Sequence, residues 1–417
     1  MKLKVNYHVL IWSIIIYLFA FQRALIGVSG VFSYCDELFA IILIMVIVMK
    51  CLRKLSVTRN EKQILFLMIF LCLTGLLGNL TSNIMTKPFP ILLDILSIIK
   101  VFLSFYAISI TNWDLYVYDE LIKIMAKIGR IITFIMALFL LISQVVSIGM
   151  TAGIRYGIES FQFIFNNPGN FSKFFYFLIP LLVADLYYKS TQYKKLVILI
   201  ALIVWVSTMR ARAISFCAIF LIMSFFYFSV KGKNFGTMVK NKIKISYLIV
   251  VVLIAVALSW KQLVFYFTTN TQARAVLLRY GVITMLSYFP IGAGFGTFGS
   301  DVAATYYSEL YRKYGFNYIY GMRQNETYFL NDNYWPMVMG QFGAIGTLLV
   351  ARILFVFIKM VLDETKKNKY FYFSTFCAMI FLLLSSTASK SYSEFSSICV
   401  FLLVGIFVKR SRKQGEL

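Results

Sequence analysis

Long apolar runs recur along the whole chain, and they limit what it can fold into. A helix needs about 20 apolar residues to cross the ~30 Å hydrocarbon core of a bilayer. The chain is 60% hydrophobic and 14% charged with a mean hydropathy of +0.80, which excludes a soluble globular domain and a disordered chain. The sequence predicts an all-α, polytopic integral membrane protein. Its twelve expected spans are 9–28, 38–52, 63–80, 89–110, 131–149, 171–187, 193–209, 213–230, 246–262, 335–358, 370–386 and 395–408.

The basic residues predict the orientation of these spans. The net charge of +24 would suggest nucleic acid only if Lys and Arg gathered on one folded face, whereas they lie in short clusters between the apolar runs. With both termini in the cytoplasm, 26 of the 41 basic residues fall in inward segments and 13 in outward segments. This bias is typical of a multi-pass protein of the bacterial cytoplasmic membrane.

We expect residues 1–417 to form a single membrane domain. Two of its outward segments are notable for their length. Residues 263–334 form an expected outer loop of 72 residues, far longer than the ~2–8 residues that usually join bundled helices. A smaller outer loop covers residues 150–170 and carries Arg155, a candidate substrate-binding residue. Because loops of such length are usually functional, we expect the activity in the outer half of the bundle.

A hairpin between two short spans carries a pair of arginines, Arg210 and Arg212. Arms of 17 and 18 residues are short of the bilayer core, so the turn is expected at or just below the outer interface. An Arg there needs an anionic partner or a wet cavity, or else reaches lipid phosphate. If the segment is helical, the two side chains point to nearly opposite sides, which favours Arg210 for a site and leaves Arg212 a supporting role.

The large loop contains closely spaced glycines. Gly294, Gly296 and Gly299 match GxGxxG, but no strand precedes them and the loop faces outward, so dinucleotide binding is excluded. Such glycines can instead turn backbone N–H groups toward an anion. Ser300 and Asp301 then predict the start of a helix over 301–314.

That helix would carry a tyrosine face, with Tyr307, Tyr311 and Tyr314 at i, i+4 and i+7. Tyrosine rings stack on sugars, so the face is a candidate oligosaccharide-binding surface. An interfacial aromatic belt that lies on the membrane is the equal alternative. Arg323, further along the loop, is a further candidate substrate-binding residue.

Carboxylates near the ends of spans are the candidate bases. Asp332 precedes the tenth span and could act as a general base or only cap that helix. Asp36 and Glu37 open the second span and are weaker candidates, since acids favour helix N-termini anyway. His8 is the only histidine and no Asp-x-Asp occurs, so we expect no His-based catalytic triad, metal site or cofactor.

Five loose motifs follow one another in a fixed order. They are YCDEL at 34–38, NPGN at 167–170, STMRAR at 207–212, RYG at 279–281 with PIGAGFG at 290–296, and DNYW at 332–335 running to GQFGAIG at 340–346. With the long loop before the last three spans, this order resembles the O-antigen polymerase (Wzy-like) and O-antigen ligase superfamily of bacterial polysaccharide-assembly membrane proteins.

The resemblance implies a GT-C-like fold and a metal-independent, lipid-linked glycan polymerase. Such an enzyme transfers a glycan from undecaprenyl pyrophosphate onto the next lipid-linked repeat unit of O-antigen, capsule or exopolysaccharide, at the outer face. Arg210 and Arg279 would engage the donor pyrophosphate. Ligases carry a His where this chain has Asp332, which favours a polymerase. A flippase and a chain-length regulator are the implied protein partners.

Three alternatives remain open at this level. The chain could be an O-antigen ligase-type transferase. It could be a lipid-linked oligosaccharide flippase or another transporter, although such proteins usually show repeated halves and short outer loops. It could also be a different lipid-phosphate-sugar glycosyltransferase that uses Asp36 or Glu37.

Overall fold

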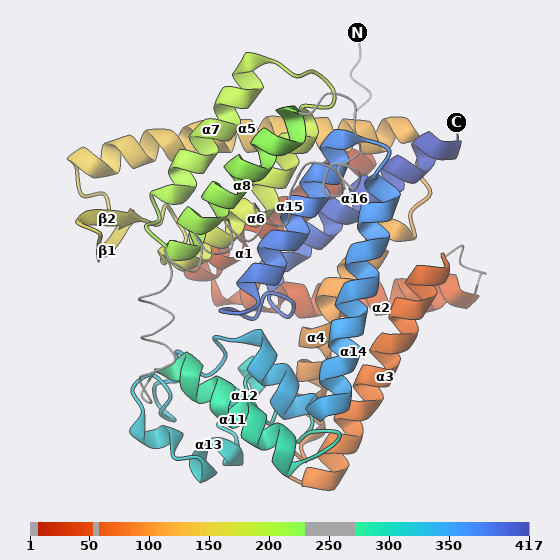
Figure 1. Ribbon diagram of the computed structural model, residues 1–417, viewed down its shortest axis with the longest axis vertical. Coiled ribbons are helices and arrows are strands. Elements are labelled where there is room, and N and C mark those ends of the chain that lie inside the picture. The colour runs from red at the N-terminus through yellow and green to blue at the C-terminus, as the bar shows by residue number, and fades with distance from the viewer. Residues whose placement is uncertain (1–6, 53–57, 230–271, 417) are drawn as a thin grey trace.

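The computed structural model describes residues 7–52, 58–229 and 272–416, and the regular structure there is almost entirely helical (Figure 1). The helices are α1 (Tyr7–Val28), η1 (Gly30–Tyr34), α2 (Cys35–Leu52), α3 (Arg59–Ser82), α4 (Pro88–Ser109), α5 (Leu115–Val145), α6 (Pro168–Asp185), α7 (Gln192–Val206), α8 (Ala211–Ser229), α11 (Ala273–Ser287), α12 (Asp301–Thr305), α13 (Glu309–Lys313), η2 (Phe316–Tyr318), α14 (Tyr334–Thr365), α15 (Lys369–Ser385), η3 (Phe395–Ser397) and α16 (Ile398–Glu416).

Each expected span within the described residues overlaps a helix, although the bounds differ in places. The span at 246–262 lies outside the described residues. By length and composition, six described segments could cross a membrane: residues 7–28, 30–49, 59–82, 88–109, 115–145 and 334–365. A predominantly helical chain with several membrane-length apolar helices is thus confirmed. The count of twelve stays a prediction, because helices such as α7, with 15 residues or about 22 Å, are short for a bilayer.

One two-stranded β-hairpin accompanies the helices of the described residues. Strand β1 (Thr151–Arg155) pairs antiparallel with β2 (Ile158–Phe161) in the segment expected as the smaller outer loop. The Phe161 N–H donates to the Ser207 carbonyl at 2.9 Å. This bond ties the hairpin to the turn that precedes Arg210.

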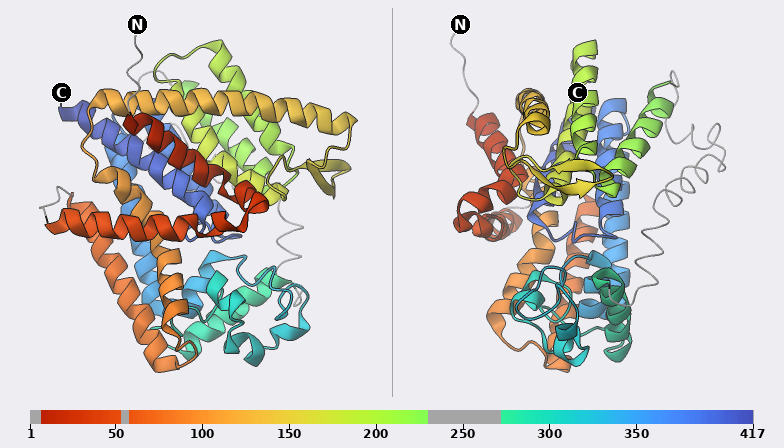
Figure 2. Two further views of the ribbon diagram at one scale, coloured as in Figure 1. Left: turned by 180° about the vertical axis from the view of Figure 1, so that it is seen from behind. Right: turned by 90° about the vertical axis from the view of Figure 1, so that its left-hand side faces the viewer.

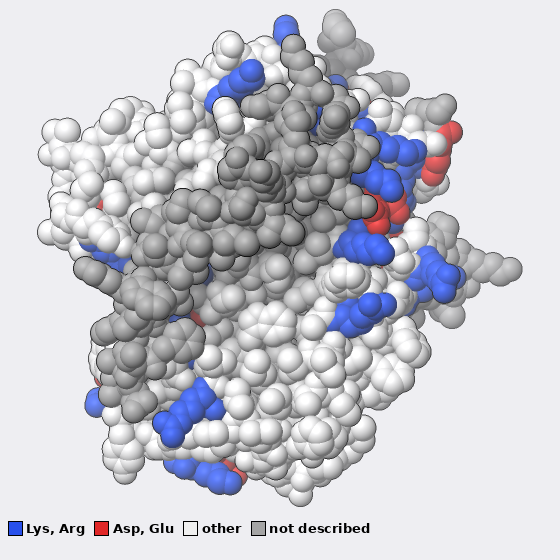
Figure 3. Space-filling model, viewed as in Figure 1, with Lys and Arg blue, Asp and Glu red and all other residues white. Residues whose placement is uncertain are grey.

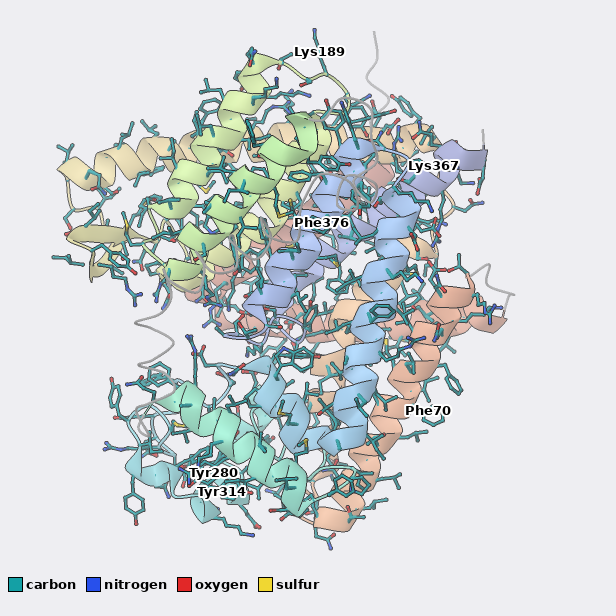
Figure 4. The ribbon with its side chains drawn as sticks, viewed as in Figure 1. Phe70, Lys189, Tyr280, Tyr314, Lys367 and Phe376 are labelled. Atoms are coloured by element: carbon teal, nitrogen blue, oxygen red, sulfur yellow. The ribbon has the colours of Figure 1, made fainter. Side chains whose placement is uncertain are left out.

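Helix α3 presents one apolar face to its surroundings. Phe66, Ile69, Leu73, Leu77 and Leu80 are each between half and three-quarters exposed, and Figure 3 shows a broad area without charged side chains over the lower parts of α3 and α14. Phe70 likewise points away from the helix in Figure 4. Apolar side chains displayed in this way suit contact with lipid.

Helix α5 starts well before the predicted span at 131–149 and lies across the end of the molecule that carries both termini (Figure 2). Its first half is amphipathic, with Tyr118, Leu121 and Met125 buried at a spacing of three to four residues. Polar residues on the other face interrupt the apolar pattern, so this half does not form a continuous apolar run in the sequence. Asp119 there accepts from Arg410 Nε of α16 at 2.9 Å.

Helix α14 bends sharply at Gly343, where φ is +62° and ψ is −157°. The uninterrupted helix predicted over 335–358 is therefore wrong. The bend is held by the glycine-rich segment 290–294: Ala293 N–H donates to the Gly340 carbonyl (2.9 Å), and Gly294 N–H to the Gln341 carbonyl (2.8 Å). A helix that is broken inside a protein needs other donors for its exposed carbonyls, and this segment supplies them.

Lys100 of α4 forms buried ion pairs with Asp36 and Glu37 of α2, and the Lys100 and Asp36 side chains are 5% and 2% exposed. Gln22 Nε2 also donates to Asp36 at 2.8 Å. These contacts give the two carboxylates a structural role, and Asp94, six residues before Lys100, has different partners.

We expect Lys100→Met to destabilise the protein by about 3–5 kcal/mol, because the change leaves carboxylates buried without their cation. Thermal unfolding of the purified protein in detergent measures the effect. Asp36→Asn in the same chain should recover part of the loss. A Lys100→Met protein as stable as the wild type would contradict the assignment.

Candidate anion site

Residues 272–333 fold against α3, α4 and α14, at the end away from both termini (Figures 1 and 2), and do not form an open loop. Two buried polar side chains anchor the glycine-rich segment. Asn79 of α3 exchanges two hydrogen bonds with the Phe295 backbone, at 2.8 and 2.9 Å. Asp94 of α4 accepts from Gly296 N–H (2.6 Å) and from Gln341 Nε2 (2.8 Å). These bonds fix the segments on either side, which carry the candidate site residues.

We expected these glycine amides to face a bound anion. For the three glycines of the GxGxxG match this expectation is wrong, because their N–H groups bind the protein itself. The N–H groups of Gly294, Gly296 and Gly299 donate to Gln341, Asp94 and Tyr311 of the protein itself. The left-handed backbone at all three glycines thus serves internal packing.

The tyrosine face is also corrected. The single helix expected over 301–314 is two short helices, α12 and α13, separated by Tyr307 at φ +46°. Tyr307 and Tyr311 are 2% and 0% exposed, and Tyr314 stacks on Tyr280 of α11 with ring centroids 4.6 Å apart (Figure 4). These rings form a core, so Tyr307 and Tyr311 offer no surface on which a sugar could stack.

Arg210 lies at the turn before α8, against the start of α6. Its Nη2 donates to Asn167 Oδ1 (3.1 Å), which also accepts from Gly169 N–H and caps α6. Its Nε atom is buried and has no hydrogen-bond partner among the residues that the structure describes. Burial, followed by the charges of Arg155, Arg212 and Arg274, lowers the pKa of Arg210 to about 10, against an opposing effect of Asp332.

Arg212 leaves the same turn in a different direction. Its Nη1 donates to the Ser385 hydroxyl at 3.4 Å and to the Ala388 carbonyl at 3.3 Å. The segment 386–397, between α15 and α16, was missed in the sequence analysis. Its signal was the polar run SSTASKSYSEFSS at 385–397, placed between two apolar runs.

Asp332 is paired with Arg274, a residue that the sequence analysis did not select. Nε and Nη2 of Arg274 both donate to Asp332 Oδ2, at 2.9 and 2.8 Å, and the two side chains are 26% and 34% exposed. The N-cap residue of α14 is Asn333, so the capping role expected of Asp332 belongs to its neighbour. Next to Asp332, Asn331 donates to Asp301, which also pairs with Lys390 of the segment 386–397.

We call this group of residues the polar ring. Hydrogen bonds and ion pairs link Arg212 to the Ala388 carbonyl, Lys390 to Asp301, Asp301 to Asn331, and Asp332 to Arg274. The charges of Arg155, Arg212, Arg274 and Asp332 act on Arg210. Among the charges that act on Arg210, three arginines face one carboxylate, so this surrounding favours an anion of more than one charge.

Two predicted residues lie elsewhere. Arg279 is exposed on α11, with its guanidinium 6.0 Å from the centre of the Tyr280 ring. Five helical residues separate it from Arg274, which turns the two side chains about 140° apart. Arg323 is 52% exposed and lies 3.9 Å from Glu326. The structure therefore brings together Arg155, Arg210, Arg212 and Asp332 of the predicted set.

No group of three or more His, Cys, Asp and Glu side chains within the described residues is arranged to hold a metal ion. No protein-family model and no curated protein matches this chain.

Proposed function

We propose that this protein is a polysaccharide repeat-unit polymerase. It would transfer a glycan from undecaprenyl pyrophosphate onto the next lipid-linked repeat unit at the outer face of the bacterial cytoplasmic membrane. The observation that carries the proposal is the surrounding of Arg210 within the described residues: its Nε is buried without a partner, and the charges of Arg155, Arg212 and Arg274 act on it against that of Asp332. Such a cluster suits a diphosphate.

The proposed chemistry follows from charge. When the sugar leaves undecaprenyl pyrophosphate, negative charge develops on the diphosphate oxygens, and guanidinium groups already in place stabilise that charge better than water does. Arginine also binds phosphate oxygens in pairs, which orients the leaving group. In this scheme Arg274 takes the role expected of Arg279, because Arg274 is the α11 arginine beside Asp332.

The placement in the membrane belongs to the same proposal. Twelve spans in a GT-C-like arrangement would put both termini in the cytoplasm and the polar ring on the outer side. The two-to-one distribution of basic residues supports this orientation. A flippase that delivers the substrate and a chain-length regulator are the partners that such a polymerase requires.

We assign binding of the acceptor glycan to exposed tyrosines and no longer to the buried Tyr307 and Tyr311. Tyr318, Tyr320 and Tyr328 are 89%, 70% and 69% exposed in the segment that follows α13. Exposed aromatic rings offer stacking faces for sugars. Within the proposal, these three residues bind the growing chain.

A strain that lacks the gene tests the proposal against its rivals. Loss of a polymerase leaves single repeat units on the surface acceptor, whereas loss of a flippase leaves none displayed. A ligase deletion leaves polymer on the lipid carrier and none on the acceptor. Wild-type protein expressed in the deletion strain should restore the long-chain ladder. Absence of all repeat units from the surface would refute the polymerase.

Diphosphate binding gives a direct test of the arginine cluster. We expect a polyprenyl pyrophosphate to raise the Tm of the purified protein, and the rise should shrink at high salt, since screening weakens exposed charge pairs. Because the pKa of Arg210 is about 10, the effect should also weaken as the pH rises through that value. The neutral polyprenol is the matched control, and an equal rise with the polyprenol would contradict diphosphate recognition.

A further inference from the structure

The polar ring contains two carboxylates in different surroundings. Asp332 receives two N–H groups of one guanidinium and lies on the side of the arginine cluster. Asp301 has other partners: Asn331 Nδ2 donates to its Oδ1 and Lys390 Nζ to its Oδ2. The Asp301 side chain is 50% exposed, and the Lys390 side chain is 19% exposed. Asp301 is thus open to a second substrate while its partners hold its orientation.

We infer that Asp301 is the catalytic base of the transfer and that Lys390 and Asn331 position it. The inference rests on the proposed function. It assigns the proton acceptor of the transfer, which the arginine cluster alone does not supply. In a single displacement, the attacking hydroxyl and the leaving diphosphate lie on opposite sides of the anomeric carbon. The described partners of Asp301 are Lys390 and Asn331, whereas Asp332 is bound by Arg274, so Asp301 is the carboxylate that the arginine cluster leaves for the attacking hydroxyl.

The step balances as follows. The acceptor hydroxyl oxygen forms a bond to the anomeric carbon of the donor glycan, while the bond from that carbon to the diphosphate oxygen breaks. The bonding electrons leave with undecaprenyl pyrophosphate, next to Arg210 and Arg274. The hydroxyl proton passes to the Asp301 carboxylate and then to water. The product has the inverted anomeric configuration.

The charges around Asp301 keep its carboxylate ionised, the form that can accept a proton. Partial desolvation by its neighbours raises the pKa of Asp301, but Lys390, Lys100 and the hydrogen bond from Asn331 lower it below its usual value overall. Asp94 of α4 is a further charged group near it. Asp301 is therefore ionised at neutral pH.

The test uses purified full-length protein in proteoliposomes with a synthetic undecaprenyl-pyrophosphate-linked repeat unit. Asp301→Asn should lower kcat by about 10²–10⁴-fold with little change in the donor KM, since a missing base slows the chemical step. Asp332→Asn is the matched control; it should mainly raise the donor KM. Formate should partly rescue Asp301→Ala and should not change Asp332→Ala. Near-wild-type kcat in Asp301→Asn would overturn the inference.

A second variant tests the inference even if the Asp301 variants fail to fold. Lys390→Met keeps the carboxylate and removes the cation that lowers its pKa, so the acid limb of the kcat/KM profile should move to higher pH. An unmoved limb would overturn the inference. Wild-type protein that makes no polymer would refute the proposed function itself, whereas an active wild type with an equally active Asp301→Asn would refute only the role of Asp301.

Discussion

The Arg210→Gln protein is expected to fold at least as stably as the wild type and to lose about 10²–10³-fold of its polymerisation rate, the usual effect of removing one preorganised donor. The pKa of Arg210 lies below that of a free arginine, so its charged form is less favourable in the folded than in the unfolded state. That cost is present at every pH below about 10, and Gln removes it.

Two measurements on one preparation check this prediction: the Tm in detergent and the length distribution of the glycan formed. Arg312→Gln is the matched control, because Arg312 is an exposed arginine of α13 whose partners are Gln324 and the Tyr307 ring. It should leave the polymer unchanged. A normal ladder in Arg210→Gln would remove Arg210 from the mechanism, and a large fall in Tm would show that the residue is structural.

Gly343→Ala is expected to prevent the protein from forming the site. A Cβ atom at position 343 would lie 2.4 Å from Gly292 N and from the Pro290 carbonyl oxygen, and the positive φ adds strain. Both contacts are with backbone, so no side chain can move aside. We expect a loss of about 3 kcal/mol or more, which combines backbone strain with overpacking.

The yield of monodisperse protein in detergent and its Tm measure this effect. Gly30→Ala is the matched control, since a Cβ at Gly30 would meet nothing within 4 Å. Gly292→Ala should fail in the same way as Gly343→Ala, because its Cβ would lie 2.3 Å from Gly343 N. A Gly343→Ala protein with wild-type yield and Tm would contradict the described contact between the two segments.

The sequence predicted the helices well wherever burial or lipid contact makes a run continuously apolar. It failed where a helix is amphipathic, as in the first half of α5, and where an apolar run contains a break, as at Gly343. The residues next to Gly343 in the sequence give no sign that the helix breaks there. Only its contact with Gly292, distant in the chain, shows that the backbone must turn there.

The candidate site was predicted in part for a similar reason. Arg210 and Arg212 were recognisable because they interrupt an apolar hairpin. Arg274 was missed because its importance depends on Asp332, 58 residues away, and on the phase of α11, which separates it from Arg279. Lys390 and Asp301 are likewise brought together by the fold across 89 residues. Spacing along the chain does not reveal such pairs.

The most direct test of the central claim is a count of products from the purified protein in proteoliposomes supplied with an undecaprenyl-pyrophosphate-linked repeat unit. The account predicts one undecaprenyl pyrophosphate released for each glycosidic bond formed, and loss of both products together in Arg210→Gln. Movement of the intact lipid-linked unit across the bilayer, with no new glycosidic bond and no diphosphate released, would contradict it.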